Sequence, residues 1–449
     1  MTSASLANTS VPTSPGFLDR LARRVVTRQL DGLRRGEILL HDASGSTTLG
    51  QPDDLHVALH IHRPRFFRQA LMGGSLSVAD SYLRGDWDCD DLTSLFRIFV
   101  RNRDSADRLD GGLARLASYG HKLFHWWHAN SRQGSRQNIS AHYDLGNDFF
   151  RLWLDDTMAY SSGIFPTPDA SLLEASTEKF DRVCRKLELS TSDDLLEIGT
   201  GWGGFAIHAA THYDCQVTTT TISREQFEVA RQRIDEAGLT DRVTLLQQDY
   251  RDLRGQFDKL VSIEMIEAVG HRYLDQYFRQ CGQLLRPDGS LVLQAIVMPE
   301  RGYEQYLKSV DFIQRYIFPG GCLPSLAAIA ASVGRTTDLR LVHAEDFAPH
   351  YAETLRRWRH SFQSRLDQVR GLGYSDEFIR LWNYYLCYCE ATLEERYVGV
   401  VQIQFDKPQC RRDPMALSRH AAANHGRMPA AQPSVRASRE NTVCGMSGA

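Results

Sequence analysis

Hydrophobic positions follow a regular alternation between residues 195 and 405. Short apolar runs, each of the length of a buried strand, are separated by longer stretches with helical spacing. Such an alternation is typical of an α/β fold in which helices cover both faces of a doubly wound, largely parallel sheet. The seven predicted strands cover residues 195–199, 216–222, 243–249, 259–265, 290–297, 340–347 and 398–405. The segment Arg286-Pro287-Asp288-Gly289 predicts a tight turn before the fifth strand.

A different pattern precedes this region and predicts a smaller α+β domain. Residues 17–35 carry apolar side chains at helical spacing, and residues 37–40 and 55–61 alternate like strands. The predicted helix contains six arginines and only two aspartates, so it can lie on an anionic membrane surface. A surface helix packed against its own domain is the other interpretation.

Composition and charge narrow the class of protein. The chain of 449 residues is 42% hydrophobic and 24% charged, which is typical of a globular protein. Its net charge of −3 indicates that it is not a general nucleic-acid binder. Residues 1–15 lack the apolar core of a signal peptide, and no apolar run reaches the length of about 18 residues that a membrane span needs. Together with nine scattered cysteines, these features predict a cytoplasmic protein with free thiols.

The first predicted strand runs into a glycine-rich turn, Leu195-Leu196-Glu197-Ile198-Gly199-Thr200-Gly201-Trp202-Gly203-Gly204. Its G-x-G-x-x-G spacing fits a dinucleotide fold, but the second strand ends without the carboxylate that binds a nicotinamide ribose. The turn fits S-adenosylmethionine better, with Glu197 near the cofactor's ammonium group and the glycines beside its carboxylate and sulfonium. A plain strand-to-helix turn is the alternative at this point.

Two groups of histidines raise the question of a metal site. His56, His60 and His62 share one face of a predicted strand, and His121, His125 and His128 share one face of a predicted helix. No carboxylate or cysteine at ligand spacing accompanies the first group, and Cys387 and Cys389 alone are a poor metal signal. Both groups are interpreted as structural, and no metal site is predicted.

Five longer stretches are more specific than the glycine turn. Together they resemble the cyclopropane-fatty-acyl-phospholipid synthases and their mycolic-acid relatives, over roughly residues 37–407. The stretches are Ala-His-Tyr-Asp-Leu-Gly-Asn-Asp-Phe-Phe (141–150), Met-Ala-Tyr-Ser-Ser (158–162), Gln-Asp-Tyr-Arg-Asp-Leu (248–253), Ile-Glu-Ala-Val-Gly (266–270) and Tyr-Ile-Phe-Pro-Gly-Gly-Cys-Leu-Pro (316–324). The resemblance implies a seven-stranded, Rossmann-like methyltransferase fold that binds S-adenosylmethionine.

The resemblance also implies an activity. Enzymes of this family transfer a methyl group from S-adenosylmethionine to the cis double bond of an acyl chain in a membrane phospholipid. A base, in this family a bound bicarbonate ion, then removes a proton from the new methyl group and the cyclopropane ring closes. Peripheral association with the inner face of the membrane is expected, and homodimers are common in the family.

Carried over to this chain, the resemblance assigns ten positions to the cofactor. They are Tyr160, Ser161, Glu197, Gly199, Gly201, Gly203, Thr221, Gln226, Tyr250 and Arg251. Thr221 and Gln226 take the place of the missing ribose carboxylate.

The catalytic positions match the family less completely. Glu267, Tyr351 and Cys389 stand at the carboxylate, tyrosine and second cysteine positions, whereas Ser162 replaces the first cysteine and Gln294 replaces the histidine. Glutamine is never charged, and a neutral hydrogen bond is about half as strong as a charge-assisted one, so bicarbonate would bind more weakly. Methyl transfer without ring closure, giving a methylene or methyl-branched chain, therefore stays open. A non-catalytic lipid-binding protein and a methyltransferase for small amines or phenols are the remaining alternatives.

The complete prediction has four parts. Residues 1–15 form a disordered N-terminus and residues 16–130 a lipid- or membrane-associated domain. Residues 131–407 form the methyltransferase domain, and residues 408–449 a disordered basic tail.

Overall fold

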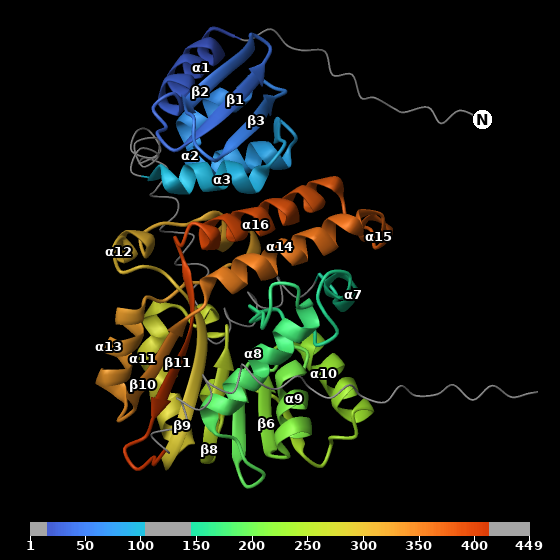
Figure 1. Ribbon diagram of the computed structural model, residues 1–449, viewed down its shortest axis with the longest axis vertical. Helices are drawn as coiled ribbons and strands as arrows, with labels where there is room; N and C mark the ends of the chain where they lie inside the picture. Colours follow the sequence, from blue (N-terminus) through green and yellow to red (C-terminus); the bar gives the residue numbers. More distant parts are fainter. Residues whose placement is uncertain (1–15, 104–144, 413–449) are drawn as a thin grey trace, which may run out of the picture. The chain divides into compact units, whose positions relative to one another are not determined.

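The larger sheet confirms the predicted doubly wound α/β fold (Figure 1). The computed structural model describes residues 16–103 and 145–412. Within them, seven strands lie in the order β10-β11-β9-β8-β5-β6-β7. Their bounds are β5 (Asp194–Ile198), β6 (Gln216–Thr221), β7 (Val243–Gln247), β8 (Phe257–Ile263), β9 (Leu285–Val297), β10 (Arg340–Asp346) and β11 (Gly399–Asp406). β5 to β9 are parallel to one another, whereas β11 is antiparallel to both β9 and β10.

Two hydrophobic layers enclose this sheet, because successive side chains on a strand point to opposite faces. Leu195 and Val261 pack against the helices of one face, and their neighbours Leu196 and Leu260 pack against those of the other. The first face carries α8 (Leu172–Leu187), α9 (Gly204–Tyr213) and α10 (Arg224–Glu236), and the second carries α11 (Leu274–Leu284) and α13 (Leu326–Thr336).

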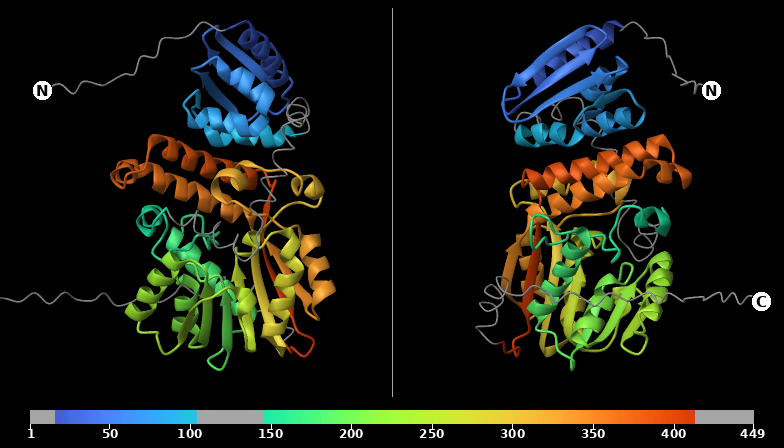
Figure 2. Two further views of the ribbon diagram at one scale, coloured as in Figure 1. Left: turned by 180° about the vertical axis from the view of Figure 1, so that it is seen from behind. Right: turned by 45° about the vertical axis from the view of Figure 1, so that its right-hand side comes forward.

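The carboxyl ends of the strands are covered by helices that follow them in the chain. α14 (Ala348–Ser364) and α16 (Asp376–Glu394) run side by side there, joined through α15 (Leu366–Gly371) (Figure 2). Shorter elements complete this region: α7 (Asn147–Arg151), η1 (Tyr250–Asp252), η2 (Ile266–Ala268), η3 (His271–Tyr273), α12 (Tyr303–Tyr306) and the π-helical turn η4 (Ile313–Ile317).

Within residues 16–103, the N-terminal part is a four-stranded sheet with three helices. Its strand order is β2-β1-β3-β4, with β1 antiparallel to β2 and parallel to β3. The elements are α1 (Phe17–Leu30), β1 (Gly36–Asp42), β2 (Gly45–Gln51), β3 (His56–Ile61), α2 (Arg65–Leu83), β4 (Trp87–Cys89) and α3 (Leu92–Arg101). The α+β character predicted from the sequence is present, but β2 and β4 were not predicted.

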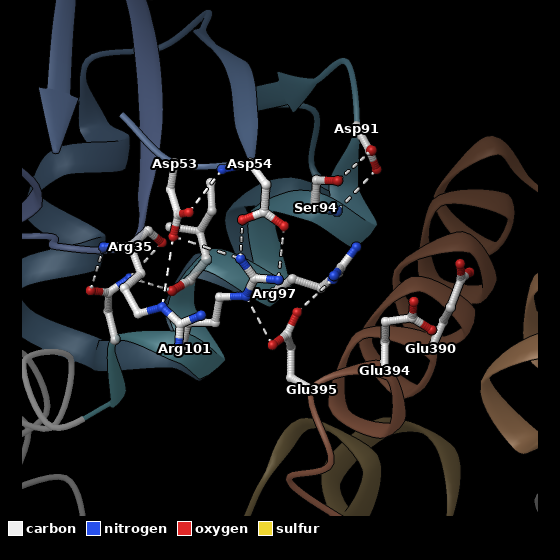
Figure 3. Close-up of polar contacts among 12 residues, drawn as sticks. Arg35, Asp53, Asp54, Asp91, Ser94, Arg97, Arg101, Glu390, Glu394 and Glu395 are labelled. Carbon is white, nitrogen blue, oxygen red and sulfur yellow. Dashed lines mark hydrogen bonds and ion pairs between the residues drawn. The ribbon is translucent and has the colours of Figure 1, made fainter. Parts of the chain in front are cut away.

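Helix α3 packs against α16, and a cluster of charges joins the two helices at one end (Figure 3). Arg97 Nε donates a 2.7 Å hydrogen bond to Glu395 Oε1, and Arg101 Nε lies 2.9 Å from Glu395 Oε2. Arg101 also pairs with Asp54 in the loop before β3. Residues 16–103 and 145–410 therefore belong to one compact unit.

Three sequence predictions need correction. The first helix ends at Leu30 and not at Arg35, because the backbone N–H groups of Arg34 and Arg35 turn to donate to Asn102 Oδ1. The segment 286–289 lies inside the bounds of β9 as an irregularity opposite β8, where Arg286 pairs with Asp194 and Asp258.

The third correction concerns the C-terminal tail, which was predicted to begin at residue 408. Gln409 N donates to Pro287 O at 3.1 Å, and Cys410 N donates to Lys407 O at 3.0 Å, so ordered contacts continue to Cys410. The remaining disorder predictions, the domain boundary near residue 130 and the histidines at 121, 125 and 128 fall outside the described residues.

The histidines of β3 have ordinary structural partners. The His60 ring stacks on His41 with centroids 4.8 Å apart, and His62 Nε2 lies 3.0 Å from Asp88 Oδ2. Among the residues that the structure describes, no group of three or more potential ligands could hold a metal ion. Within the same residues, no helix combines the length and apolarity that a membrane crossing requires.

Candidate active site

A cavity of ≈ 1140 Å³ lies at the carboxyl ends of the parallel strands. In doubly wound folds this edge is where ligands bind, because the loops that leave the strands diverge there. Most of the predicted site residues line this cavity, namely Tyr160, Ser161, Glu197, Gly199, Gly201, Thr221, Gln226, Tyr250, Arg251, Glu267, Tyr351 and Cys389. Gly203, Ser162 and Gln294 are not part of its wall.

The glycine turn shapes one end of the cavity. Gly199, Gly201 and Gly203 all have positive φ, at 108°, 53° and 86°, which glycine adopts without the strain that other residues meet. A Cβ at Gly201 would project into open space, so the backbone there is directly accessible to a ligand. Gly203 instead supports the turn as the N-cap of α9.

Glu197 is suited to a positively charged ligand. Its side chain is only 3% exposed, and Thr219 Oγ1 donates a 2.6 Å hydrogen bond to Oε2. Burial raises the pKa of Glu197 to about 8, although Thr219 and Lys179 favour its charged form. An ammonium group beside this carboxylate would compensate for its desolvation, as the predicted position of the cofactor requires.

The two residues predicted to bind the ribose contact each other. Thr221 Oγ1 donates to Gln226 Oε1 at 3.0 Å, and both residues are buried in the cavity wall. With its oxygen held by Thr221, the amide of Gln226 has N–H donors left for another acceptor, such as a ribose hydroxyl.

Tyr250 and Arg251 follow β7 at the same edge of the sheet. Tyr250 lines the cavity and packs edge-on against Tyr277, with centroids 5.5 Å apart. The Arg251 guanidinium is held by Asp249, with Nε donating to Oδ1 at 2.8 Å and Nη2 to Oδ2 at 2.6 Å. The charge of Arg251 is therefore balanced by Asp249, and the planar guanidinium forms part of the cavity wall.

Tyr160 and Ser161 are oriented by residues that the sequence analysis did not identify. The Tyr160 and Tyr385 hydroxyls lie 2.8 Å apart, and the fully buried Lys179 donates from Nζ to Ser161 Oγ at 2.6 Å. Burial lowers the pKa of Lys179 to about 8, against the attraction of Glu264, Asp155 and Glu197. A lysine in the helix before the first strand gives no sequence signal of such a position.

Glu267 faces the cavity with one oxygen engaged. Oε1 accepts a 2.6 Å hydrogen bond from Ile296 N, and Oε2 is buried without a hydrogen-bond partner among the described residues. Burial, with a contribution from the nearby Glu264, raises the pKa of Glu267 to about 8. An unpartnered carboxylate oxygen in a cavity wall is a polar atom that a ligand can satisfy.

The sequence analysis missed Glu264, which lies at the end of β8 within the predicted strand 259–265. Glu264 Oε1 accepts hydrogen bonds from Ser162 N at 2.9 Å and from Gln294 Nε2 at 2.7 Å. The Tyr351 hydroxyl is a further partner of the same carboxylate. A charged residue at the carboxyl end of a buried parallel strand is the signal that could have identified it.

These contacts bear on the predicted bicarbonate ion. Three of the positions expected to hold that anion, Ser162, Gln294 and Tyr351, are hydrogen-bonded to the side chain of Glu264 instead. Gln294 is fixed in this orientation because its Oε1 accepts from Gln402 Nε2 at 3.0 Å. The residues present therefore do not fit a separate anion at this position.

Part of the remaining wall is apolar and suits a hydrocarbon chain, and the charged residues Arg103, Arg301, Lys308 and Asp311 line the cavity as well. Aromatic rings of Tyr160, Phe318 and Tyr385 stand near the carboxylates, and Cys389 of α16 lies in the same wall. Further along, the wall is formed by Leu76, Phe99, Val310, Ile313, Leu323 and Leu393. Leu76 and Phe99 come from α2 and α3, so the N-terminal part contributes to the cavity.

Comparison with known proteins places this site in a family. The family model described as mycolic acid cyclopropane synthetase matches residues 130–403. Among curated proteins, "Tuberculostearic acid methyltransferase UfaA1" of Mycobacterium tuberculosis is 40% identical over 80% of this chain and 85% of its own length. "Cyclopropane-fatty-acyl-phospholipid synthase" of Escherichia coli is 36% identical over 78% of this chain and 87% of its own length.

Solved structures similar to this chain belong to the same class of enzymes. The mycolic acid cyclopropane synthase CmaA1 in complex with SAH and CTAB is 32% identical, with a TM-score of 0.57 over 61% of this chain and 98% of that one. The cyclopropane synthase MmaA2 from Mycobacterium tuberculosis is 30% identical, with the same TM-score and coverage. SAH is the product that S-adenosylmethionine leaves after methyl transfer, and the glycine turn, Glu197 and the Thr221–Gln226 pair of this chain fit that cofactor. The chain belongs to the mycolic acid cyclopropane synthetase family, whose members are S-adenosylmethionine-dependent enzymes.

Proposed function

We propose that the chain transfers a methylene group from S-adenosylmethionine to the cis double bond of an unsaturated acyl chain in a phospholipid, closing a cyclopropane ring. The observation that carries this proposal is the continuity of the cavity. The cofactor residues at the glycine turn and the apolar wall formed by α2, α3 and α16 belong to the same cavity, with Glu264, Glu267 and Tyr351 between them. Such a cavity can bring a sulfonium methyl group and a hydrocarbon chain together away from water.

The chemistry defines what the protein must supply. S-adenosylmethionine, when bound, provides an electrophilic methyl group, and an alkene is a weak nucleophile. The enzyme must therefore hold the two partners in line and exclude water from the cationic carbon that forms. The buried walls provide the exclusion, and the faces of Tyr160, Phe318 and Tyr385 offer π electrons to a developing positive charge.

We also propose that the protein meets its substrate at the inner surface of a membrane through α1. Phe17, Leu18 and Leu21 are 72%, 61% and 50% exposed, although Ala22, Val26 and Leu30 of the same helix are buried in the domain. Both sequence interpretations of this helix thus find support on different faces. Arg24 and Arg28 are exposed beside the apolar group, whereas Arg23 pairs with Asp42 at 2.5 Å.

The enzymatic proposal is tested with methyl-labelled S-adenosylmethionine and phospholipid vesicles. Label should enter phospholipids with cis-unsaturated chains, and NMR of the released chains should show cyclopropane protons. Vesicles of the same head group with saturated chains are the control and should remain unlabelled. Vinylic methylene protons in the product would show methyl transfer without ring closure. The spectra are examined for this outcome because one relative is named a methyltransferase. Equal labelling of saturated vesicles would refute the proposal.

A further inference from the structure

The position of Glu264 is unusual for a carboxylate. It is partly buried between β8, β9 and α14, and it lines the cavity where the acyl chain is proposed to react. Its backbone has φ of 48°, a left-handed conformation that glycine adopts freely and glutamate rarely does. The backbone N–H is nevertheless held by Gln294 O at 2.8 Å. Strained backbone of this kind is concentrated at functional sites.

Burial raises the pKa of Glu264, and the hydrogen bonds and the positive charge around its side chain oppose this effect by favouring the ionised form. Two N–H donors, from Ser162 and Gln294, meet on Oε1, and the Tyr351 hydroxyl is a third donor. Lys179 also favours the charged form through its positive charge. Hydrogen bonds to the ionised form of a carboxylate oppose the effect of burial on its pKa.

Glu267 is differently placed although it lies in the same cavity. It accepts only from Ile296 N, and its second oxygen has no donor among the described residues. Of the two carboxylates, Glu264 therefore has more donors that stabilise the ionised form, whereas Glu267 has a single backbone donor. The proton acceptor of the reaction is therefore expected at Glu264.

We propose that the carboxylate of Glu264 is the catalytic base of ring closure and that this chain works without a bound bicarbonate ion. The inference rests on the proposed function. In the first step the π electrons of the double bond form a C–C bond to the methyl group, and the S–C bond electrons remain on sulfur. In the second step a Glu264 oxygen takes a proton from the transferred methyl group, and the C–H electrons form the second C–C bond of the ring. No oxidant or reductant is needed.

The test combines removal of the base with its replacement by a small anion. Glu264→Gly fits the left-handed backbone and opens a space beside Ser162 N and Gln294, so added bicarbonate or formate can occupy it. Glu264→Gln is the matched control, because it fills the same space without a base. Rates of cyclopropane formation are measured in carbonate-depleted buffer with and without each anion, and S-adenosylmethionine binding is measured by calorimetry. Binding of ¹³C-bicarbonate is followed by NMR without the cofactor.

The proposal makes a distinct prediction for each protein. The unmodified chain should not respond to bicarbonate, and both variants should lose at least about 100-fold in rate while still binding S-adenosylmethionine. Bicarbonate should bind only to Glu264→Gly and restore its activity. It should not restore the activity of Glu264→Gln. A wild-type requirement for bicarbonate, near-normal activity of Glu264→Gln, or bicarbonate bound to Glu264→Gly without rescue would each overturn the base role. Absence of any product from the unmodified chain would instead refute the proposed function.

Discussion

Three glutamates define the chemistry at the scale of single residues. Glu197 is the penultimate residue of β5, and Glu264 and Glu267 follow β8, so the parallel sheet gathers three carboxylates at one edge. Their environments differ, because Glu197 has one hydroxyl donor, Glu264 several donors and Glu267 one backbone donor. Different environments allow chemically identical groups to have different roles. In the proposed reaction, Glu197 binds a cationic ligand and Glu264 accepts a proton.

The pKa of Glu197 predicts a pH dependence of cofactor binding. Because burial raises this pKa to about 8, the carboxyl is largely protonated below that pH in the free protein. A cationic ligand favours the ionised form, so binding should release a proton and the affinity should fall as the pH decreases below about 8, by up to about tenfold per pH unit. Calorimetry of S-adenosylmethionine in buffers of different ionisation enthalpy measures both effects. Glu197→Gln should bind more weakly and without this dependence; an unchanged pH dependence in that variant would contradict the assignment.

The Thr221–Gln226 pair gives a second prediction about the cofactor. Gln226→Ala removes both the amide and the partner of the Thr221 hydroxyl, so the Kd for S-adenosylmethionine should increase about tenfold. Glu228→Ala is the control, since this residue is exposed on the same helix. Equal affinities of the two variants would exclude Gln226 from the binding site.

Sequence reasoning identified more residues of the cavity wall near the glycine turn than around Glu264. The glycine turn and Glu197 are adjacent in the chain, and their spacing reflects a local strand-to-helix structure. Glu264, Ser162 and Gln294 come from separate segments, and only the pairing of β8 with β9 and the path of the chain after Tyr160 bring them together. The substitutions at Ser162 and Gln294 led to the expectation of altered anion binding, which stays a prediction, but gave no indication of Glu264 as their hydrogen-bond partner.

Helix α16 links the two parts of the molecule at the scale of elements. Tyr385, Tyr388 and Cys389 line the cavity, whereas Tyr384 packs against Phe96 of α3 with ring centroids 4.7 Å apart. Just after the helix, Glu395 binds the two arginines of α3 (Figure 3). The position of the reaction cavity's wall thus depends on contacts with the N-terminal part.

Loss of this charge cluster should destabilise the fold. Glu395→Ala leaves Arg97 and the largely buried Arg101 without their shared partner, and the expected decrease in the free energy of unfolding is about 1–2 kcal/mol. Glu394→Ala is the matched control, because Glu394 pairs with Arg356 in a more exposed position and should cost less than about 1 kcal/mol. Urea unfolding compares them, and equal stability of the two variants would mean that the cluster contributes nothing specific.

The predictability of the elements followed the strength of their apolar patterns. All seven strands of the large sheet were predicted to within a few residues, except that β9 begins before its irregular segment. Strand β2 of the small sheet was not predicted, because Leu49 is its single buried side chain and the rest of the strand is polar. Its conformation depends on pairing with β1, which the local sequence does not encode.

At the scale of the whole molecule, the N-terminal part has an exposed surface and also forms part of the cavity wall. Gly74 and Leu76 of α2 and Phe99 of α3 line the cavity, and α1 belongs to the same small domain. Under the proposed function, a substrate anchored in a bilayer would be reached from that surface. This proposal would give a domain without catalytic carboxylates a role in the enzyme.

Replacing the exposed apolar residues of α1 should weaken membrane binding. Phe17→Ser, Leu18→Ser and Leu21→Ser combined are expected to reduce co-sedimentation with anionic vesicles at least about tenfold without loss of stability, because the three side chains are exposed. Leu39→Ser, a change of an exposed leucine on β1, is the control and should bind normally. If the triple variant sediments like the unmodified chain, another surface contacts the membrane.

The central claim is that this chain closes a ring on an unsaturated acyl chain with a carboxylate of its own. The most direct measurement uses S-adenosylmethionine with a trideuterated methyl group and cis-unsaturated phospholipid vesicles in carbonate-depleted buffer. The account predicts a cyclopropane product that has lost one deuterium, formed at the same rate after bicarbonate is added. A product that keeps all its deuterium, or a reaction that begins only with added bicarbonate, would contradict it.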